Sequence, residues 1–348
     1  LTDWFLDEFF GGAEMVDEEL IKLLESQGNL VTKRKTEDTD TEFIRENKHK
    51  RFIISNYMRL PKDPKKELIE TCDYLLYEHD HKYTVNKNPA AYPNYMVPER
   101  YLINQEFYQG ALGIVCQTKM HAEVLSKNLK VDNVVSVGSS LWEPQFLDAI
   151  SKLKATKNGR AAIIESSNKI KNQGPAEAYC QKNNISYDTI SASTSLGLAK
   201  KLANYEYLVF FPSVLETLSR IAVEAKMIGC KLITNRLLGA ASEDWFKESP
   251  EVIIQEMKNA REKTVSIVEG VFDKKKHIKS PTHPNSKITV LLNSYRRPYN
   301  LEKQVEAIKA QTISPHQIWL WVNKHPDNAL FDHSSAGVDR IFDTDHNW

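Results

Sequence analysis

The sequence predicts an α/β protein with two Rossmann-like domains, a cleft between them, and a partial third α/β segment. Short apolar runs alternate with amphipathic helical stretches along the 348 residues, which is the pattern of βα units in a parallel sheet. Polar stretches interrupt this alternation twice and indicate domain boundaries. Hydrophobic residues make up 41% of the chain, enough for substantial cores, and the length allows two or more domains.

The first domain is expected over residues 1–152. Its first helix, over 13–27, places Val16, Leu20 and Leu24 on one face. Only ten residues precede Gly11, and acidic residues interrupt them, so we expect the first central strand to be short or missing and strand edges to be exposed. Helices are expected between strands at 51–55, 74–78, 113–117 and 133–137.

The second domain is expected over residues 153–272, after a polar stretch at 153–160. Its last helix, over 250–271, should cross back onto the first domain. The strands are predicted at 161–166, 186–190, 205–211 and 231–234, and the other helices at 175–183, 195–203 and 218–228.

A basic, proline-bearing linker over residues 273–287 precedes the third segment, residues 288–348. A strand, a helix and a second strand are expected there, at 288–293, 301–311 and 317–322. Roughly sixty residues are too few for a complete α/β domain of ordinary size.

Composition narrows the class of function. Lys+Arg and Asp+Glu are both 46, and this balance argues against a general nucleic-acid partner or a polybasic membrane contact. The four cysteines are scattered, mostly in apolar runs, which is typical of reduced core residues of a cytoplasmic protein. No apolar run approaches the roughly 18 residues of a membrane span, and no signal peptide is visible. Because the chain lacks an initiator Met and stops abruptly at Trp348, we expect a fragment at both ends.

The stretch from Val209 to Ala225 predicts a buried strand, a tight turn and a helix. It carries Glu216 in the turn and Glu224 two helical turns later. Helix N-termini attract phosphate, and ligands of parallel sheets bind at the carboxyl ends of strands. A nucleotide diphospho-sugar offers a diphosphate and a ribose diol to such a site. The alternative is a surface helix with two solvated glutamates.

Four motifs carry a family resemblance over about residues 1–272, and the paired glutamates are the most specific of them. In order they are Gly11-Gly12-Ala13-Glu14, Tyr77-Glu78-His79-Asp80, Cys116-Gln117-Thr118-Lys119, and Pro212-Ser213 with Glu216 and Glu224-Ala225, followed by Gly229–Thr234. This part of the chain resembles retaining glycosyltransferases of the GT-B fold, similar to glycosyltransferase family 4. The resemblance implies transfer of a sugar, of hexosyltransferase type, with retention of configuration by same-face attack.

The donor-binding residues are assigned on this basis. Gly11 and Gly12 permit close backbone approach to phosphate, and the alternative there is an ordinary loop-to-helix turn. Leu218 and Ser219 are expected to present backbone N–H groups. Lys169 or Lys171 is expected to pair with a phosphate, although either could equally be a solvated loop lysine.

The chain departs from the family at one point. The family usually has Gly-Arg at the end of the first strand of the second domain, whereas here Gly159-Arg160 precedes that strand. The phosphate-pairing arginine is therefore absent or replaced, for example by Arg220, and this puts donor affinity and activity in question.

Two residues are assigned to the reaction centre and one to the ribose. His79 follows a strand, so it should face the cleft and hydrogen-bond the sugar or the acceptor. Glu216 is assigned to the sugar hydroxyls or to charge at the reaction centre, and Glu224 to the ribose hydroxyls, because a carboxylate accepts two hydrogen bonds from a diol. His79 with His81 could instead form a metal pair, or His79 could be a capping or solvated loop residue.

The third segment resembles the start of a GT-A glycosyltransferase domain of family 2, on the strength of its opening residues 289–298. Asp343-Thr344-Asp345 has the spacing of a metal-binding Asp-x-Asp, but that pair usually lies further along in the fold, so we favour a loop after a strand.

The sequence thus predicts a glycosyltransferase that uses a nucleotide diphospho-sugar and no cofactor or metal. The acceptor is not identified. Two alternatives stay open: a catalytically silent GT-B module that binds nucleotide-sugars or scaffolds a partner, and an enzyme of the same architecture with other sugar chemistry, such as epimerisation or phosphorolysis.

Overall fold

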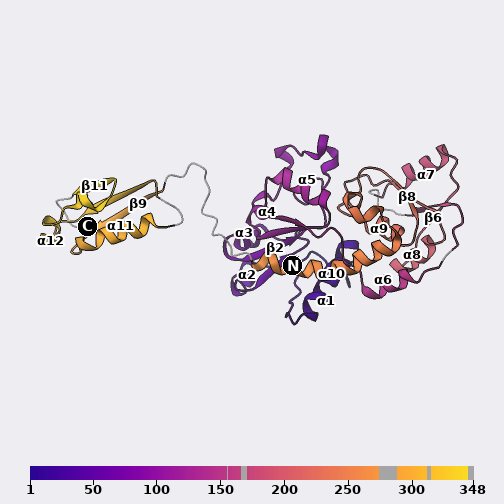
Figure 1. Cartoon of the computed structure of the whole chain (residues 1–348), viewed down its shortest axis with the longest axis horizontal. Helices are drawn as coiled ribbons and strands as arrows, with labels where there is room; N and C mark the ends of the chain where they lie inside the picture. The colour runs from indigo at the N-terminus through magenta and orange to yellow at the C-terminus, as the bar shows by residue number, and fades with distance from the viewer. Residues whose placement is uncertain (155, 166–170, 274–287, 312–314, 344–348) are drawn as a thin grey trace. The chain divides into compact units, whose positions relative to one another are not determined.

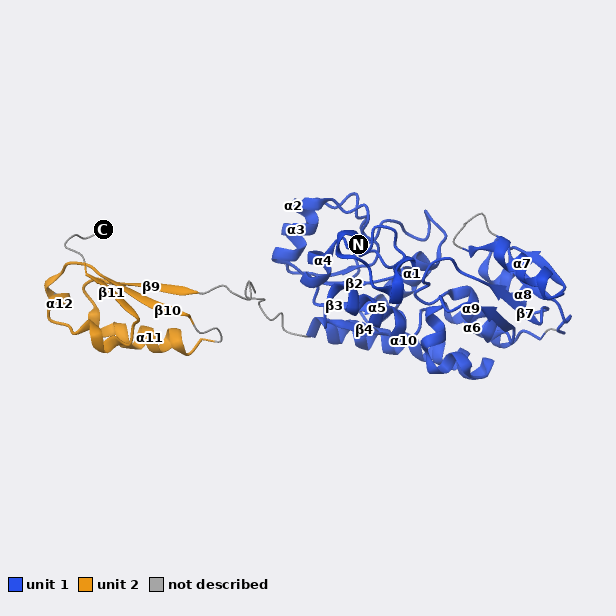
Figure 2. Ribbon diagram, turned by 90° about the horizontal axis from the view of Figure 1, so that it is seen from above, with its two compact units in different colours: residues 1–276 blue, residues 277–348 orange. Residues whose placement is uncertain are grey.

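The computed structural model describes residues 1–154, 156–165, 171–273, 288–311 and 315–343. The chain divides into two compact units, residues 1–276 and residues 277–348 (Figure 2). The first unit contains two separate parallel sheets, as the sequence predicts, and the second contains a third. The finer division of the first unit at residues 152/153 stays a prediction. None of the helices in the described ranges is both long and apolar enough to cross a membrane.

The first sheet has the order β1-β2-β3-β4, with every neighbouring pair parallel. Alternate residues of each strand serve opposite faces, so Leu75 and Tyr77 pack into one core while Tyr74 and Leu76 pack into another. The strands are β1 (Arg51–Ile54), β2 (Asp73–Tyr77), β3 (Gly113–Cys116) and β4 (Val134–Ser136). Both faces are apolar because helices cover both.

Two helices precede β1, and three others lie between consecutive strands of this sheet. The helix α1 presents Val16, Leu20 and Leu24 to the core on one face of the sheet, as its periodicity predicts. The helices are α1 (Gly12–Ser26), α2 (Thr41–Glu46), α3 (Lys62–Thr71), α4 (Gln105–Gly110) and α5 (Lys119–Leu129), with short 3₁₀ helices at Pro89–Ala91, Pro93–Tyr95 and Glu99–Tyr101.

The segment before Gly11 contains no strand, as the sequence predicts; Thr2 makes only an isolated parallel bridge to Lys35. The backbone nitrogen of Leu1 donates to the carbonyl oxygen of Ile53 at 2.6 Å.

The second sheet has the order β6-β5-β7-β8 and is also fully parallel. Its strands are β5 (Ala161–Ile164), β6 (Tyr187–Ile190), β7 (Tyr207–Phe210) and β8 (Lys231–Thr234). The helices that accompany it are α6 (Pro144–Ser151), α7 (Gln173–Lys182), α8 (Ser195–Leu202) and α9 (Arg220–Met227), with 3₁₀ turns at Gly239–Ser242 and Asp244–Lys247. The helix α6 packs into the core of this sheet through Phe146, Leu147 and Ile150.

The long helix α10 (Pro250–Asp273) joins the two sheets (Figure 1). Near its start, Ile253 and Met257 are buried in the core of the second sheet. Near its end, Val268 and Val271 are buried in the core of the first sheet beside α1. The expected return of this helix onto the first sheet is therefore observed.

The second unit is a three-stranded parallel sheet of order β11-β10-β9. The helix α11 (Leu301–Lys309) covers one face of it through Leu301, which packs with Leu320 and Val322. The remaining elements are β9 (Thr289–Ser294), β10 (Gln317–Val322), α12 (Pro326–Ala329), β11 (Arg340–Asp343) and 3₁₀ turns at Pro298–Asn300 and His333–Ala336. Of the Asp-x-Asp candidate only Asp343 is described; Thr344 and Asp345 lie outside the described residues.

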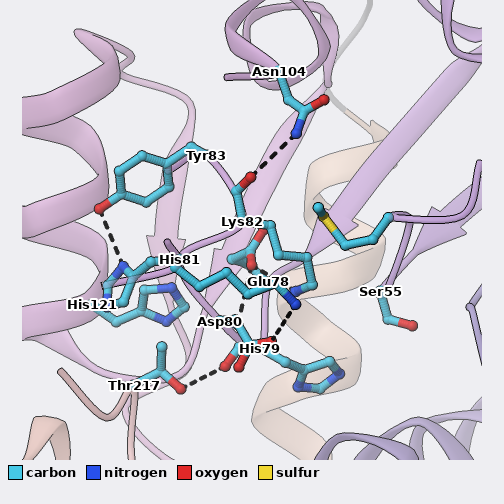
Figure 3. A network of polar contacts seen from close by, with 12 residues as sticks. Ser55, Glu78, His79, Asp80, His81, Lys82, Tyr83, Asn104, His121 and Thr217 are labelled. Atoms are coloured by element: carbon cyan, nitrogen blue, oxygen red, sulfur yellow. Dashed lines mark hydrogen bonds and ion pairs between the residues drawn. The ribbon is translucent and has the colours of Figure 1, made fainter. Parts of the chain in front are cut away.

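A fully buried ion pair supports the loop that follows β2 (Figure 3). Lys82 Nζ lies 2.7 Å from Glu78 Oε1, and both side chains are 0% exposed. The hydroxyl of Tyr108 donates to the second oxygen of Glu78, and the backbone N–H of Asp80 donates to Oε1. These bonds compensate the buried charge of the carboxylate, so the pair fixes the loop over residues 78–82.

Lys82→Met keeps the volume of the side chain but leaves the Glu78 carboxylate buried without its cation. We expect this variant to lower the free energy of unfolding by about 3–5 kcal/mol. Lys66→Met is the matched control, because Lys66 also pairs with the residue four positions away but is 75% exposed. Urea denaturation measures both, and equal midpoints for the two variants would contradict the assigned role of the buried pair.

Candidate functional site

A cavity of about 720 Å³ lies between the carboxyl ends of the two sheets of the first unit. His79 and Gln117 reach it from the ends of β2 and β3, and Ile164 and Phe210 reach it from β5 and β7. The starts of α1 and α9 complete its wall. Convergent strand ends and helix N-termini are the usual setting for ligands of parallel sheets.

The turn over Glu216–Leu218 forms one wall of this cavity, and backbone contacts hold it. The N–H of Glu216 donates to Leu237, and the N–H groups of Gly239 and Ala240 donate to Glu216 and Leu218. A Cβ on Gly239 would lie 2.4 Å from the carbonyl oxygen of Thr217. Glycine at position 239 is therefore what allows the two backbone segments to approach this closely.

Ser219 precedes α9 and takes an unusual backbone conformation, with φ 78° and ψ 92°. The residue lines the cavity, and its buried hydroxyl oxygen makes no hydrogen bond to any described residue. A non-glycine residue held at positive φ costs of order 1–3 kcal/mol and is enriched at ligand sites. The conformation places an unused donor at the start of the helix.

Glu224 lies deeper than the sequence analysis assumed. It lines the cavity but is only 4% exposed, and its Oε1 accepts a hydrogen bond of 2.9 Å from the indole N–H of Trp142. Burial raises the pKa of the Glu224 carboxyl, against the lowering effects of Arg220 and of the Trp142 bond. The side chain therefore has a structural partner as well as access to the cavity.

Arg220 lies across the cavity wall toward the glycine pair. Its guanidinium stacks on the indole of Trp142, 4.4 Å from the ring centroid, and Nη1 donates to the carbonyl oxygen of Leu141. A Cβ on Gly12 would lie 3.3 Å from Cδ of Arg220. Gly12 thus leaves room for the side chain of Arg220, whereas the neighbours of Gly11 are Glu14 and Phe9.

Lys171 and Glu216, which the sequence assigns to phosphate and to sugar, form an ion pair of 3.1 Å. Both line the cavity, with side chains 33% and 15% exposed. The other lysine candidate, Lys169, lies outside the described residues. Any ligand that approaches Glu216 also meets the cation beside it.

His79 is buried and paired with a carboxylate that the sequence analysis did not select. Its Nε2 lies 2.7 Å from Oδ1 of Asp17 on α1. Asp17 also accepts hydrogen bonds from the hydroxyls of Thr2 and Ser55. The Nδ1 of His79 is buried and makes no hydrogen bond within the described structure. The pairing orients the ring and leaves one nitrogen for a ligand.

His81 lies beside His121, and its Nδ1 lies 3.1 Å from the hydroxyl oxygen of Tyr83 (Figure 3). Burial lowers the pKa of His81 to about 3, so its imidazole is neutral at physiological pH. No group of three or more potential metal ligands occurs in the described part of the chain.

Three residues of the site carry no assignment from the sequence: Asp17, Trp142 and Thr217. Asp17 left a signal, because it shares the buried face of α1 with Leu20 and Leu24, where a carboxylate needs a partner. Trp142 and Thr217 left no signal in the sequence, because each contacts a residue far away along the chain. Trp142 contacts a residue 82 positions away, and Thr217 contacts one 138 positions away.

No family model and no curated protein sequence matches the chain. Solved structures with a similar fold include a TarM mutant from S. aureus in complex with fondaparinux, alpha-GlcNAc-glycerol and UDP (14% identity, 64% of this chain and 55% of that chain, TM-score 0.38). Others are Anabaena HepE in complex with UDP (10%, 75% and 95%, 0.43) and a glycosyltransferase from Rickettsia africae (11%, 73% and 88%, 0.45). The chain spans about half of the TarM chain.

Glu224→Gln is expected to change how stability depends on pH. The carboxyl has a pKa above its ordinary 4.5 in the folded state. When the pH rises above 4.5, the carboxyl of the unfolded chain loses its proton while the buried carboxyl of the folded chain still holds it. Deprotonation therefore favours the unfolded wild type, and wild type loses stability relative to the variant until the pH exceeds the folded-state pKa. The difference in melting temperature, wild type minus variant, should therefore fall between pH 4 and neutrality.

Glu256→Gln on α10 is the control for this comparison, because Glu256 is exposed. If the Glu224→Gln difference varies with pH no more than the Glu256→Gln difference, burial does not raise the pKa of the Glu224 carboxyl.

Proposed function

We propose that residues 1–276 transfer a sugar from a nucleotide diphospho-sugar to an acceptor, as a GT-B glycosyltransferase similar to family 4. One observation carries this proposal. Every described residue that the sequence assigns to the donor or to catalysis lines the same cavity, although these residues come from four separate stretches of the chain: Gly11, Gly12, His79, Lys171, Glu216, Leu218, Ser219, Arg220 and Glu224.

The diphosphate is assigned to the start of α9. The first turn of a helix offers unpaired N–H groups and a positive dipole end. Arg220 adds a permanent charge there and takes the role of the missing family arginine, and the unused hydroxyl of Ser219 adds a donor. Gly12, which lies against the side chain of Arg220, is assigned to the same phosphates.

The ribose is assigned to Glu224. One of its oxygens already accepts a bond from Trp142, but each carboxylate oxygen has two lone pairs, so capacity for a diol remains. Arg220, 3.8 Å away, favours the ionised form that accepts both hydroxyls.

The transferred sugar is assigned to the space between Glu216 and His79. Positive charge builds on the sugar and negative charge on the leaving diphosphate, and Glu216 and Lys171 are a matched pair for these charges. His79 offers its free Nδ1 to a sugar or acceptor hydroxyl. The same proposal includes retention of configuration, transfer of a hexosyl group, a metal-free reaction and a cytoplasmic location. It also includes a GT-A-like origin of residues 288–348.

The Lys171–Glu216 ion pair also favours a second candidate, a catalytically silent module that binds nucleotide-sugars. Each of the two charges is neutralised by the other, so neither is left unpaired to stabilise charge at a reaction centre. A thermal-shift screen with UDP-, GDP- and ADP-glucose identifies the donor, and release of nucleoside diphosphate from that donor separates an enzyme from a binding module.

Glu216→Gln and Glu224→Gln are a matched pair of variants that test the two roles. Bonds to charged groups contribute about 1.5–3 kcal/mol, so Glu224→Gln should weaken nucleoside diphosphate binding by roughly one to two orders of magnitude. Glu216→Gln should cut donor turnover strongly and leave that binding nearly intact. Calorimetry with the free nucleoside diphosphate measures binding. Equal losses of affinity in the two variants would mean that the roles are wrongly divided.

A further inference from the structure

The two residues proposed for the reaction centre come from opposite sides of the cavity, and one hydroxyl connects them. We propose that Thr217 is a positioning residue that sets the distance between His79 and Glu216. This inference rests on the proposed function and extends it to a residue that neither binds the donor nor reacts.

Thr217 lies in the turn after β7, and its side chain points toward the loop that follows β2 (Figure 3). Its Oγ1 lies 2.7 Å from the carbonyl oxygen of His79 and 2.7 Å from Oε1 of Gln117. A hydroxyl has one proton, so it donates to one acceptor; an amide flip of Gln117 lets Nε2 donate back to the hydroxyl oxygen. Both partners sit at strand ends of the first sheet, after β2 and β3.

The main chain of Thr217 is held as firmly as its side chain. The hydroxyl of Thr118, which is 0% exposed, donates to the carbonyl oxygen of Thr217 at 2.7 Å. On the other side Gly239 packs against the same carbonyl. Thr217 is itself only 8% exposed, so water cannot readily replace the partners of its hydroxyl.

The consequence follows from the chain order. Thr217 is covalently next to Glu216, and its hydroxyl holds the backbone of His79, so the two proposed catalytic side chains share one short connection across the cavity. Arg220 and Glu224 are held separately, by Leu141 and Trp142. Loss of the hydroxyl should therefore disturb the reaction centre and leave the nucleotide-binding groups in place.

Thr217→Val and Thr217→Ser test this, with hydrolysis of the nucleotide-sugar identified in the screen as the readout. Valine keeps the shape and removes the hydroxyl, and a misplacement of about 1 Å at a reaction centre can cost 10²-fold in rate. We expect Thr217→Val to lower kcat roughly 10- to 100-fold, with an unchanged Kd for nucleoside diphosphate. Thr217→Ser, which retains the hydroxyl, should restore most of kcat.

Thr39→Val is the matched control. Thr39 is also buried, at 1% exposed, and its hydroxyl donates to the carbonyl oxygen of Lys35 at 2.7 Å, away from the cavity. The Thr39 hydroxyl has a purely structural role. We therefore expect Thr39→Val to lower the melting temperature as Thr217→Val does, but to leave kcat unchanged.

Three results would overturn the inference: full kcat in Thr217→Val, a loss of nucleoside diphosphate affinity in that variant as large as its loss of kcat, or failure of Thr217→Ser to recover. Each of these leaves the proposed function standing if wild type turns over the donor. A wild-type protein that releases no nucleoside diphosphate from any of the three donors overturns the proposed function and this inference together.

Discussion

The close backbone contact between Glu216–Leu218 and Leu237–Ala240 is the constraint on which the site depends. It brings the turn after β7 so near to its neighbour that a methyl group on Gly239 would collide with the carbonyl oxygen of Thr217. With the turn fixed there, Glu216 meets Lys171, Thr217 meets His79, and α9 begins where Ser219 can face the cavity. Displacement of this turn would separate Glu216 from Lys171 and Thr217 from His79, and it would move Ser219 away from the cavity.

Two further features hold the two sheets of the first unit in position around that turn. The helix α10 is buried at one end in the core of the second sheet and at the other in the core of the first. Glu243, only 4% exposed, accepts a hydrogen bond from the N–H of Lys119 in the first turn of α5. A buried carboxylate at a helix N-terminus is a favourable contact, so the strand ends that frame the cavity are tied together by both apolar and polar interactions.

Most of the fold could be predicted from the sequence, because apolar runs alternating with amphipathic helices determine both the strands and their parallel pairing. The candidate site was predictable in part: the motifs around Gly11, His79 and Glu216 locate it, since strand ends of parallel sheets meet at one edge. The partners of those residues were not predictable. Trp142 touches Glu224 only because α6 packs with the second sheet, and the ion pair of Lys171 with Glu216 depends on the conformation of two loops. Such contacts depend on tertiary packing and leave no local pattern.

The burial of Glu224 illustrates the same limit in energetic terms. Helical spacing places it two turns after Glu216, and that spacing is compatible with a solvated face as well as with a ligand site. The structure shows a nearly enclosed carboxyl whose pKa is raised by burial. Contacts with Trp142 and Arg220 offset the cost of removing the carboxylate from water. A charged group retained in such surroundings is a functional candidate on physical grounds.

The central claim is that one ligand, a nucleotide diphospho-sugar, spans the cavity and contacts both sheets. Hydrogen–deuterium exchange of the protein with and without UDP-, GDP- or ADP-glucose tests this most directly. The account predicts that one of these donors slows exchange both at the start of α1, after Gly11, and at the start of α9, after Ser219. Protection confined to one of the two helix starts, or no protection with any of the three donors, would contradict it.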